Sequence, residues 1–257
     1  MGTALVTGAT AGLGLEFAWQ LATARHDLVL VARTTERLDQ VAGQIRAAAG
    51  VQVEVLAADL SVPDDVARVA ERLAVTGDEP DDGRRPVGLL VNNAGFATAQ
   101  RFVGGAVGAE LRAVDVMVRA VVQLTHAAVG QMTSRGRGAV LNVASVAALT
   151  TGGTYAAAKA YVRSFTEGLT VDLRGTGVTA TVLCPGFVRT EFHERAGLDT
   201  ASIPSAGWLD APTVVAQALA DVRRGVVIST PSLRYKAGSA LLRILPRPAV
   251  RAIGHYR

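Results

Sequence analysis

The sequence has very little cysteine and histidine, and both shortages narrow what the chain can do. Cys184 is the only cysteine among 257 residues, so an intramolecular disulfide and a C-x-x-C zinc site are excluded. The four histidines have no metal-ligand spacing, and we predict no metal site; they are His26, His126, His193 and His255. A lone cysteine fits a reducing compartment, so we expect a cytoplasmic protein.

Aromatic residues and long apolar runs are also scarce. Aromatic residues make up 5% of the chain, and the basic residues are interspersed with acidic ones, although the net charge is +4. Nucleic-acid binding needs a clustered basic face with interleaved aromatic residues, so we expect no nucleic-acid partner. No uninterrupted apolar stretch has the length of a membrane-spanning helix, and the first residues already have a strand pattern, so we expect no signal peptide.

Short apolar runs are abundant, and they alternate with segments of helical period. The predicted strands are Ala4–Thr7, Leu28–Ala32, Val51–Ala57, Val87–Val91, Ala139–Val143, Val178–Leu183 and Val226–Ser229. The predicted helices are Leu13–Thr23, Thr35–Ala48, Pro63–Ala74, Ala109–Thr133, Tyr155–Leu173 and Pro212–Val222. Buried strands separated by helices predict an α/β fold, a single Rossmann-like domain over residues 1–257 with a doubly wound parallel sheet of about seven strands.

A glycine-rich turn follows the first predicted strand. The strand ends at Thr7, and three glycines follow with the spacing G-x-x-x-G-x-G. Glycine permits positive φ and close approach to a pyrophosphate, which binds at a helix N-terminus. A plain tight turn is the alternative reading. We assign the whole turn to a dinucleotide cofactor: Gly8, Thr10, Ala11, Gly12, Leu13 and Gly14.

The end of the second predicted strand indicates which dinucleotide binds. An acidic residue there selects NAD through the 2′-hydroxyl, whereas an arginine accommodates the 2′-phosphate of NADP. The chain has Ala32 and Arg33 at this point. A guanidinium binds phosphate through paired hydrogen bonds, so we predict NADP, against the alternative that Arg33 is a solvated residue of the next helix.

Six short stretches together resemble the short-chain dehydrogenase/reductase (SDR) family over most of the chain. They are T-G-A-T-A-G-L-G at Thr7–Gly14, Asp59 in A-A-D-L-S, N-N-A-G at Asn92–Gly95, Ser145 in L-N-V-A-S-V-A, Y-A-A-A-K at Tyr155–Lys159, and P-G at Pro185–Gly186 followed by Thr190. Their order, and their position at strand ends where open α/β sheets bind ligands, make the set specific.

The resemblance implies a role for each matched residue in a cofactor site. Asp59 and Leu60 would contact the adenine, and Asn93, Ala94 and Gly95 would line the ribose and stiffen the central sheet. The residues that would border the nicotinamide are Pro185, Gly186, Val188 and Thr190. The structural alternatives are a helix cap for Asp59 and a simple turn for Asn92–Gly95.

Tyr155 and Lys159 are four residues apart on a predicted helix and therefore share a face. A free tyrosine has a pKa near 10, which a neighbouring ammonium would lower, so Tyr155 is the candidate acid or base. Ser145 would hold the substrate oxygen, and Lys159, one of only two lysines, would also bind the nicotinamide ribose. The alternatives are a packing role for Tyr155 and a solvated cation at Lys159.

Two departures from the family pattern concern this catalytic group. Met117 stands where the family usually has an asparagine that supports a proton relay to the lysine, and a thioether accepts hydrogen bonds only weakly. Asp115, two residues away on a helix, would point elsewhere. The segment from Ser145 to Tyr155 is also a few residues shorter than usual, which makes their alignment less secure.

These observations predict an NADP(H)-dependent oxidoreductase that acts on a carbonyl or alcohol substrate. The alternative, motivated by Met117, is a catalytically weakened NADP(H)-binding sensor or scaffold. Apolar residues in the loops Phe96–Gly108, Ser145–Thr154 and Glu191–Leu209 indicate a hydrophobic substrate. The resemblance implies a homodimer or homotetramer. Residues 233–257 form a basic amphipathic segment, which we expect to pack over the pocket or a second subunit, with a membrane surface as the alternative.

Overall fold

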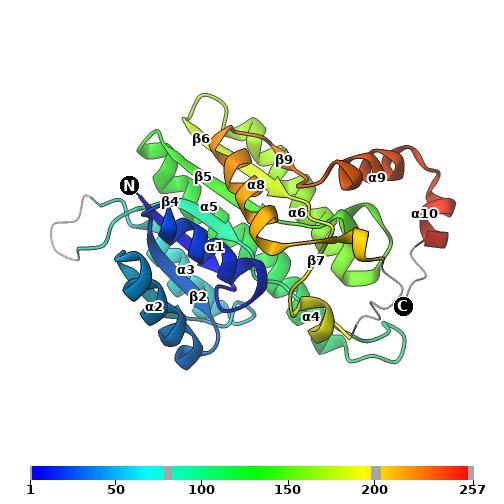
Figure 1. Ribbon diagram of the computed structural model, residues 1–257, viewed down its shortest axis with the longest axis horizontal. Coiled ribbons are helices and arrows are strands. Elements are labelled where there is room, and N and C mark those ends of the chain that lie inside the picture. Colours follow the sequence, from blue (N-terminus) through cyan, green and yellow to red (C-terminus); the bar gives the residue numbers. More distant parts are fainter. Residues whose placement is uncertain (1, 78–82, 198–203, 254–257) are drawn as a thin grey trace.

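The computed structural model describes residues 2–77, 83–197 and 204–253 (Figure 1). A seven-stranded sheet runs through the molecule in the order β3-β2-β1-β4-β5-β6-β9, and every pairing is parallel. Its strands are β1 (Thr3–Thr7), β2 (Asp27–Ala32), β3 (Val53–Ala57), β4 (Val87–Asn92), β5 (Gly138–Val143), β6 (Val178–Leu183) and β9 (Ile228–Ser229). The predicted doubly wound fold is confirmed.

Helices cover both faces of the sheet because alternate strand residues point to opposite sides. In β1, Ala4 and Val6 join the core beneath one set of helices, whereas Leu5 joins the core on the other face. The first face carries α1 (Gly12–Thr23), α2 (Thr35–Ala49) and α8 (Ala211–Arg223). The second face carries α3 (Pro63–Ala74), α5 (Ala120–Ser134) and α6 (Gly153–Asp172).

A long helical stretch, Val107–Ser134, runs along the second face. It consists of α4 (Val107–Val114), a π-helical turn η1 (Asp115–Arg119) and α5. Within the described residues this stretch is long and apolar enough to cross a membrane, judged by length and composition alone. Val116, Ala120, Leu124 and Met132 pack in the sheet core, so we interpret it as a core helix.

Most of the remaining elements lie beyond β6, where the sequence predicted a loop over Glu191–Leu209 and a basic amphipathic segment from residue 233. They are the short pair β7 (Phe187–Val188) and β8 (Trp208–Leu209), with α7 (Phe192–Arg195) and the 3-10 turn η3 (Ser205–Gly207) between them. Two further helices end the described chain, α9 (Leu233–Ile244) and α10 (Arg247–Ile253). Another 3-10 turn, η2 (Val146–Leu149), directly follows Ser145.

The sheet order places a ligand site between β1 and β4. Chain connections leave these neighbouring strands in opposite directions, since β1 continues to β2 and β4 continues to β5. Open α/β sheets bind ligands at such a switch point, beyond the carboxyl ends of the strands. The predicted glycine turn, Asn93–Gly95 and Ser145 follow β1, β4 and β5 respectively, at this edge.

Candidate active site

The glycine turn has the geometry that its residue types suggest. Gly8 and Gly12 have φ of 67° and 52°, the left-handed region in which side chains are strained. Gly14 has an ordinary conformation, but a methyl group there would collide with the main-chain oxygen of Gly8. Its role is therefore close packing of α1 against the turn itself, so that helix and turn move as one piece.

Asn93 ties this turn to the neighbouring strand. Its Nδ2 donates to the Thr7 main-chain oxygen at 2.9 Å, while the Thr7 hydroxyl accepts from the main-chain N–H groups of Asn93 and Ala94 at 2.9 and 3.0 Å. A methyl group on Gly8 would lie 2.9 Å from Asn93 Nδ2. These contacts join the ends of β1 and β4, as expected for residues that stiffen the central sheet; contact with a ribose stays a prediction.

Two arginines lie beside the turn at the end of β2. Arg33 is exposed and makes no hydrogen bond or ion pair with any residue that the structure describes. Arg37, in the first turn of α2, donates from Nε to the Thr10 main-chain oxygen at 3.5 Å. The sequence analysis missed Arg37, because Arg33 precedes the helix and the spacing between them does not show that both lie beside the turn.

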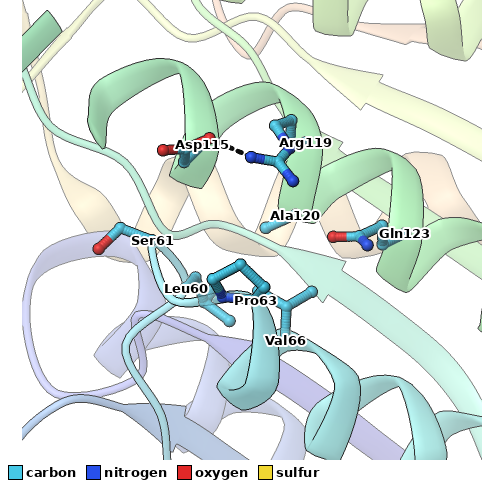
Figure 2. A pocket seen from close by; sticks show the side chains of 8 residues that line it. All are labelled: Leu60, Ser61, Pro63, Val66, Asp115, Arg119, Ala120 and Gln123. Atoms are coloured by element: carbon cyan, nitrogen blue, oxygen red, sulfur yellow. Dashed lines mark hydrogen bonds and ion pairs between the residues drawn. The ribbon is translucent and has the colours of Figure 1, made fainter. Parts of the chain in front are cut away.

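Asp59 and Leu60 follow β3, at the predicted adenine position. Asp59 Oδ1 accepts from the main-chain N–H and the hydroxyl of Ser61 at 2.9 and 2.8 Å, and thus shapes the turn before α3. Leu60 is 7% exposed and packs in the core of the second face, so its side chain has little surface left for an adenine. Figure 2 shows Leu60 turned toward Val66 in a shallow pocket between α3 and η1–α5.

The P-G-x-x-x-T segment after β6 lies close to the glycine turn. A methyl group on Gly12 would lie 3.4 Å from Thr190 Cβ, which brings these two predicted cofactor residues together. Val188 is buried, and the Pro185 main-chain oxygen accepts from the Val146 N–H at 3.0 Å. A side chain on Gly186 would overlap the ring of Tyr235 from α9, a neighbour that the sequence did not predict.

Ser145, Tyr155 and Lys159 form one group at the end of β5. Ser145 lies near enough to the Tyr155 phenol to lower its pKa slightly, and Lys159 Nζ lies 5.7 Å from the centroid of the Tyr155 ring. Lys159 is 4% exposed and its Nζ donates to the Val143 main-chain oxygen at 2.7 Å. Gly153, with φ of 66°, turns the shortened segment into α6, so serine and tyrosine align despite the missing residues.

The predicted lowering of the Tyr155 pKa by Lys159 is wrong for the protein alone. Burial raises the pKa of Tyr155 to about 12, and the nearby Ser145 side chain only partly opposes this. Burial also lowers the pKa of Lys159 to about 8. Desolvation outweighs charge here because the ammonium is held by a main-chain oxygen and not by the phenol. Tyr155 is therefore a protonated phenol at neutral pH, the form that donates a proton.

Met117 lies beside the lysine, at the position where the family pattern placed it. A methyl group on Gly95 would lie 3.2 Å from Met117 Sδ and 3.3 Å from Lys159 Nζ, so all three residues meet. Met117 is 1% exposed. Asp115 points elsewhere, as predicted, and pairs with Arg119 at 2.9 Å at the pocket in Figure 2.

A buried polar ladder that the sequence analysis missed supports this group. Asn92 Nδ2 donates to Thr125 Oγ1 at 3.0 Å and to Asn142 Oδ1 at 2.9 Å, and Asn142 Nδ2 donates to Thr166 Oγ1 at 2.9 Å. These four side chains link β4 and β5 to α5 and α6. Since α6 carries Tyr155 and Lys159, the ladder fixes the catalytic helix to the sheet.

Aromatic side chains gather over the group from the segment after β6. The Phe192 ring lies 5.6 Å from that of Tyr155, and His193 lies 5.4 Å from Phe192 and 5.0 Å from Trp208. Burial lowers the pKa of His193, whose Nδ1 has no hydrogen-bond partner among the described residues. Leu198, an apolar residue of the loop Glu191–Leu209 that the sequence analysis assigned to the substrate pocket, lies outside the described residues.

Fold and site together define a dinucleotide-binding α/β protein with a serine–tyrosine–lysine group at the switch point of its sheet. The family model described as short chain dehydrogenase matches residues 2–201. The chain belongs to the short-chain dehydrogenase/reductase family and is a pyridine-nucleotide oxidoreductase.

Relatives and solved structures agree with this assignment. The chain is 36% identical to sulfoacetaldehyde reductase 2 of Chromohalobacter salexigens, over 77% of each chain. A short-chain dehydrogenase from Sphingobium yanoikuyae in complex with NADPH has a TM-score of 0.83 and 32% identity, covering 96% of this chain and 97% of that one. A Burkholderia phymatum family member in complex with NAD has a TM-score of 0.79 and 25% identity, covering 93% and 92%.

Proposed function

We propose that the protein is an NADP(H)-dependent reductase of hydrophobic ketones or aldehydes. The observation that carries the proposal is the grouping of Ser145 and Tyr155, with Lys159 anchored beside them, on the sheet edge that bears the glycine turn. The same edge carries Arg33, an exposed cation with no partner among the described residues.

The residues at this edge fit a bound dinucleotide. Gly8 and Gly12 carry no side chain that would keep a ligand from the backbone, and α1 begins at Gly12 with no side-chain cap, which leaves its first N–H groups for a pyrophosphate. Arg33 and Arg37 lie where a 2′-phosphate needs positive charge. NADPH, when bound, supplies the hydride that reduces the substrate carbonyl carbon.

The chain's own residues then supply orientation and the proton. The Ser145 hydroxyl donates a hydrogen bond to the substrate oxygen and fixes the carbonyl near Tyr155. The Tyr155 phenol, protonated at neutral pH because burial raises its pKa to about 12, donates its proton to that oxygen. Lys159, held by the Val143 oxygen, stabilises the phenolate that remains.

The sensor alternative is less well supported by the site. This alternative is based on Met117, whose thioether cannot replace an asparagine in a proton relay to Lys159. Lys159, however, keeps its position through the Val143 oxygen, and the Ser145–Tyr155 pair is intact. A pure binding protein has no use for these three groups gathered at one point.

The lining favours an apolar substrate. The Phe192 ring lies beside that of Tyr155 at a tilt of 45°, and the rings of Phe187, His193 and Trp208 continue from it. Pockets lined by aromatic side chains with few polar groups bind apolar ligands, which the polar pair Ser145–Tyr155 would orient.

Cofactor affinity of charge-reversed variants tests the NADP assignment. We expect Arg33→Asp to weaken NADPH binding about 100-fold and to leave NADH binding nearly unchanged, because one charged hydrogen-bonded pair is replaced by repulsion. Arg37→Ala should cost NADPH about fivefold. Arg174→Asp, an exposed arginine in the turn before β6 at the opposite sheet edge, is the matched control. An unchanged NADPH-to-NADH affinity ratio in Arg33→Asp would refute the 2′-phosphate role.

A further inference from the structure

Helix α9 (Leu233–Ile244) has no part in the proposed reaction, yet its surface is unusual. The structure describes all of its residues, and none of them is buried. Leu233, Leu241 and Ile244 are 82%, 55% and 79% exposed, among the most exposed large apolar side chains described. Figure 1 shows α9 and α10 standing out from the rest of the molecule.

The exposed apolar residues of α9 form a single stripe. At 100° per residue, five positions fall within about one quarter to one third of the helix circumference. All five are exposed, and we call them the α9 stripe: Leu233, Ala237, Ala240, Leu241 and Ile244. The stripe is therefore continuous apolar surface and not a set of scattered side chains.

The opposite side of α9 is fixed to the molecule. The Tyr235 hydroxyl donates to the Gly207 main-chain oxygen at 2.7 Å and accepts from the Phe187 N–H at 3.1 Å. Tyr235 and Leu242 are half-buried, and among the regular elements α9 packs mainly on η2. These contacts hold the α9 stripe outward, so its exposure follows from how the helix is attached.

Positive charge flanks the stripe on both sides. By helical position Arg234 borders one edge and Lys236 the other. Arg243, next to Lys236 on the helix, also lines a cavity beside Ser145 and Cys184. Arg247 and Arg251 continue the exposed positive charge on α10. The sequence contains no acidic residue after Asp221, so the segment as a whole has a net positive charge.

We propose that the α9 stripe docks on an anionic lipid bilayer, with the helix lying in the plane of the interface. An apolar stripe between rows of Lys and Arg is the pattern of an interfacial helix, whose cationic side chains reach the headgroups while their stems rest on apolar surface. A second copy of the chain fits less well. In a symmetric contact it would bring the same positively charged side chains face to face.

Docking would also bring the reaction site close to the bilayer. Helix α9 packs on η2, which directly follows Ser145, and Tyr235 lies against Gly186. The idea that docking turns the reaction site toward a ketone dissolved in the bilayer rests on the proposed function. The docking itself rests only on the surface of α9.

Vesicle flotation of the purified full-length protein tests the docking. We expect binding to vesicles with about one third phosphatidylglycerol, none to pure phosphatidylcholine, and release in about 0.5 M salt, because screening removes the attraction. Leu241→Glu should weaken binding at least tenfold, and Arg243→Gln about fivefold. Leu111→Glu is the matched control, since Leu111 on α4 is 57% exposed and Leu241 is 55% exposed.

Three results would overturn the proposal. The wild-type protein could stay unbound on anionic vesicles, or Leu111→Glu could weaken binding as much as Leu241→Glu. Alternatively, sedimentation velocity could show that Leu241→Glu dissociates an oligomer that binds no vesicles, which would assign the stripe to a second copy. NADPH binding, measured in parallel, separates the two proposals. Lost docking with intact NADPH binding contradicts only the lipid assignment, whereas docking without NADPH binding contradicts only the proposed function.

Discussion

The first turn of the chain and helix α9 near its other end differ in how closely they are packed, as one glycine in each region shows. Gly14, in α1, has no room for a single methyl group, because the Gly8 main-chain oxygen occupies that space. Gly238, in α9, has no atom within 4 Å of the corresponding position. The N-terminal turn is fixed by close contacts, which leave its residue types little freedom. Helix α9 packs against the protein on one side only. The residue types on its outer side are therefore not constrained by packing within the protein.

The largest effect should come from the phenol of Tyr155, in the closely packed region. We expect Tyr155→Phe to lower kcat about 1000-fold, because the proton donor is lost, while NADPH affinity stays within about threefold. Tyr161→Phe, on the same helix, is the control, since Tyr161 is 44% exposed. Steady-state kinetics and fluorescence titration measure both quantities. Appreciable turnover in Tyr155→Phe would show that another group donates the proton.

The paired glycine variants test the comparison through stability. Gly14→Ala should lower the free energy of unfolding by about 3 kcal/mol, because the new methyl group forces α1 off the turn. Gly238→Ala should change it by less than about 1 kcal/mol, and in the stabilising direction, since alanine favours a helix. Urea denaturation measures both. Equal destabilisation by the two variants would mean that the packing contrast does not exist.

The two lysines show the same contrast, since Lys159 is buried and Lys236 on α9 is exposed. The buried lysine predicts that the stability of the protein depends on pH. Burial lowers the pKa of Lys159 to about 8, well below its unfolded value, so the folded protein loses this proton first. The unfolded state then binds more protons, and stability should rise by about 1 kcal/mol from pH 8 to 9.

Other buried groups limit that window. Cys184 opposes the rise from about pH 8 upward and Tyr155 from about pH 9, because burial raises the pKa of each, to about 11 and about 12, above that of the unfolded chain. Urea denaturation at each pH should show the rise in the wild type and in Lys236→Met, but not in Lys159→Met. A rise that survives in Lys159→Met would assign the titration to another residue.

The smallest predicted effect concerns Met117, next to Lys159. We expect Met117→Asn to raise kcat about threefold, because an amide beside the ammonium restores a polar route for the proton, at a cost of about 1 kcal/mol in stability from burying the amide. Met117→Leu keeps the side chain apolar and should match the wild type in kcat. Identical kcat values for the asparagine and leucine variants would show that the proton does not pass this position.

The sequence predicted well where residues face a continuous core. Buried parallel strands appear as apolar runs, and β6 (Val178–Leu183) and α3 (Pro63–Ala74) have the predicted bounds. The glycine turn was predictable because positive φ demands glycine. The π-turn at Asp115–Arg119 was not, since one inserted residue barely disturbs the apolar period.

The features that the sequence analysis missed share a physical cause. Each depends on contacts between residues far apart in the chain or on how deeply a side chain is buried. The reach of Arg37 to Thr10 and the polar ladder from Asn92 join residues far apart in the chain. The raised pKa of Tyr155 follows from burial, which spacing alone does not reveal. An amphipathic stripe such as that of α9 has the same sequence pattern whether it faces a core or a membrane, and only the fold shows that it faces outward.

Deuterium transfer tests the central claim most directly. The protein would be incubated with NADPH deuterated at C4 of the nicotinamide and a panel of apolar ketones and aldehydes, and the alcohols analysed by mass spectrometry. We predict deuterium on the carbinol carbon of at least one product, formed by the wild type and lost in Tyr155→Phe. NADPH that binds tightly yet transfers no deuterium to any substrate would contradict the account and favour a nucleotide sensor.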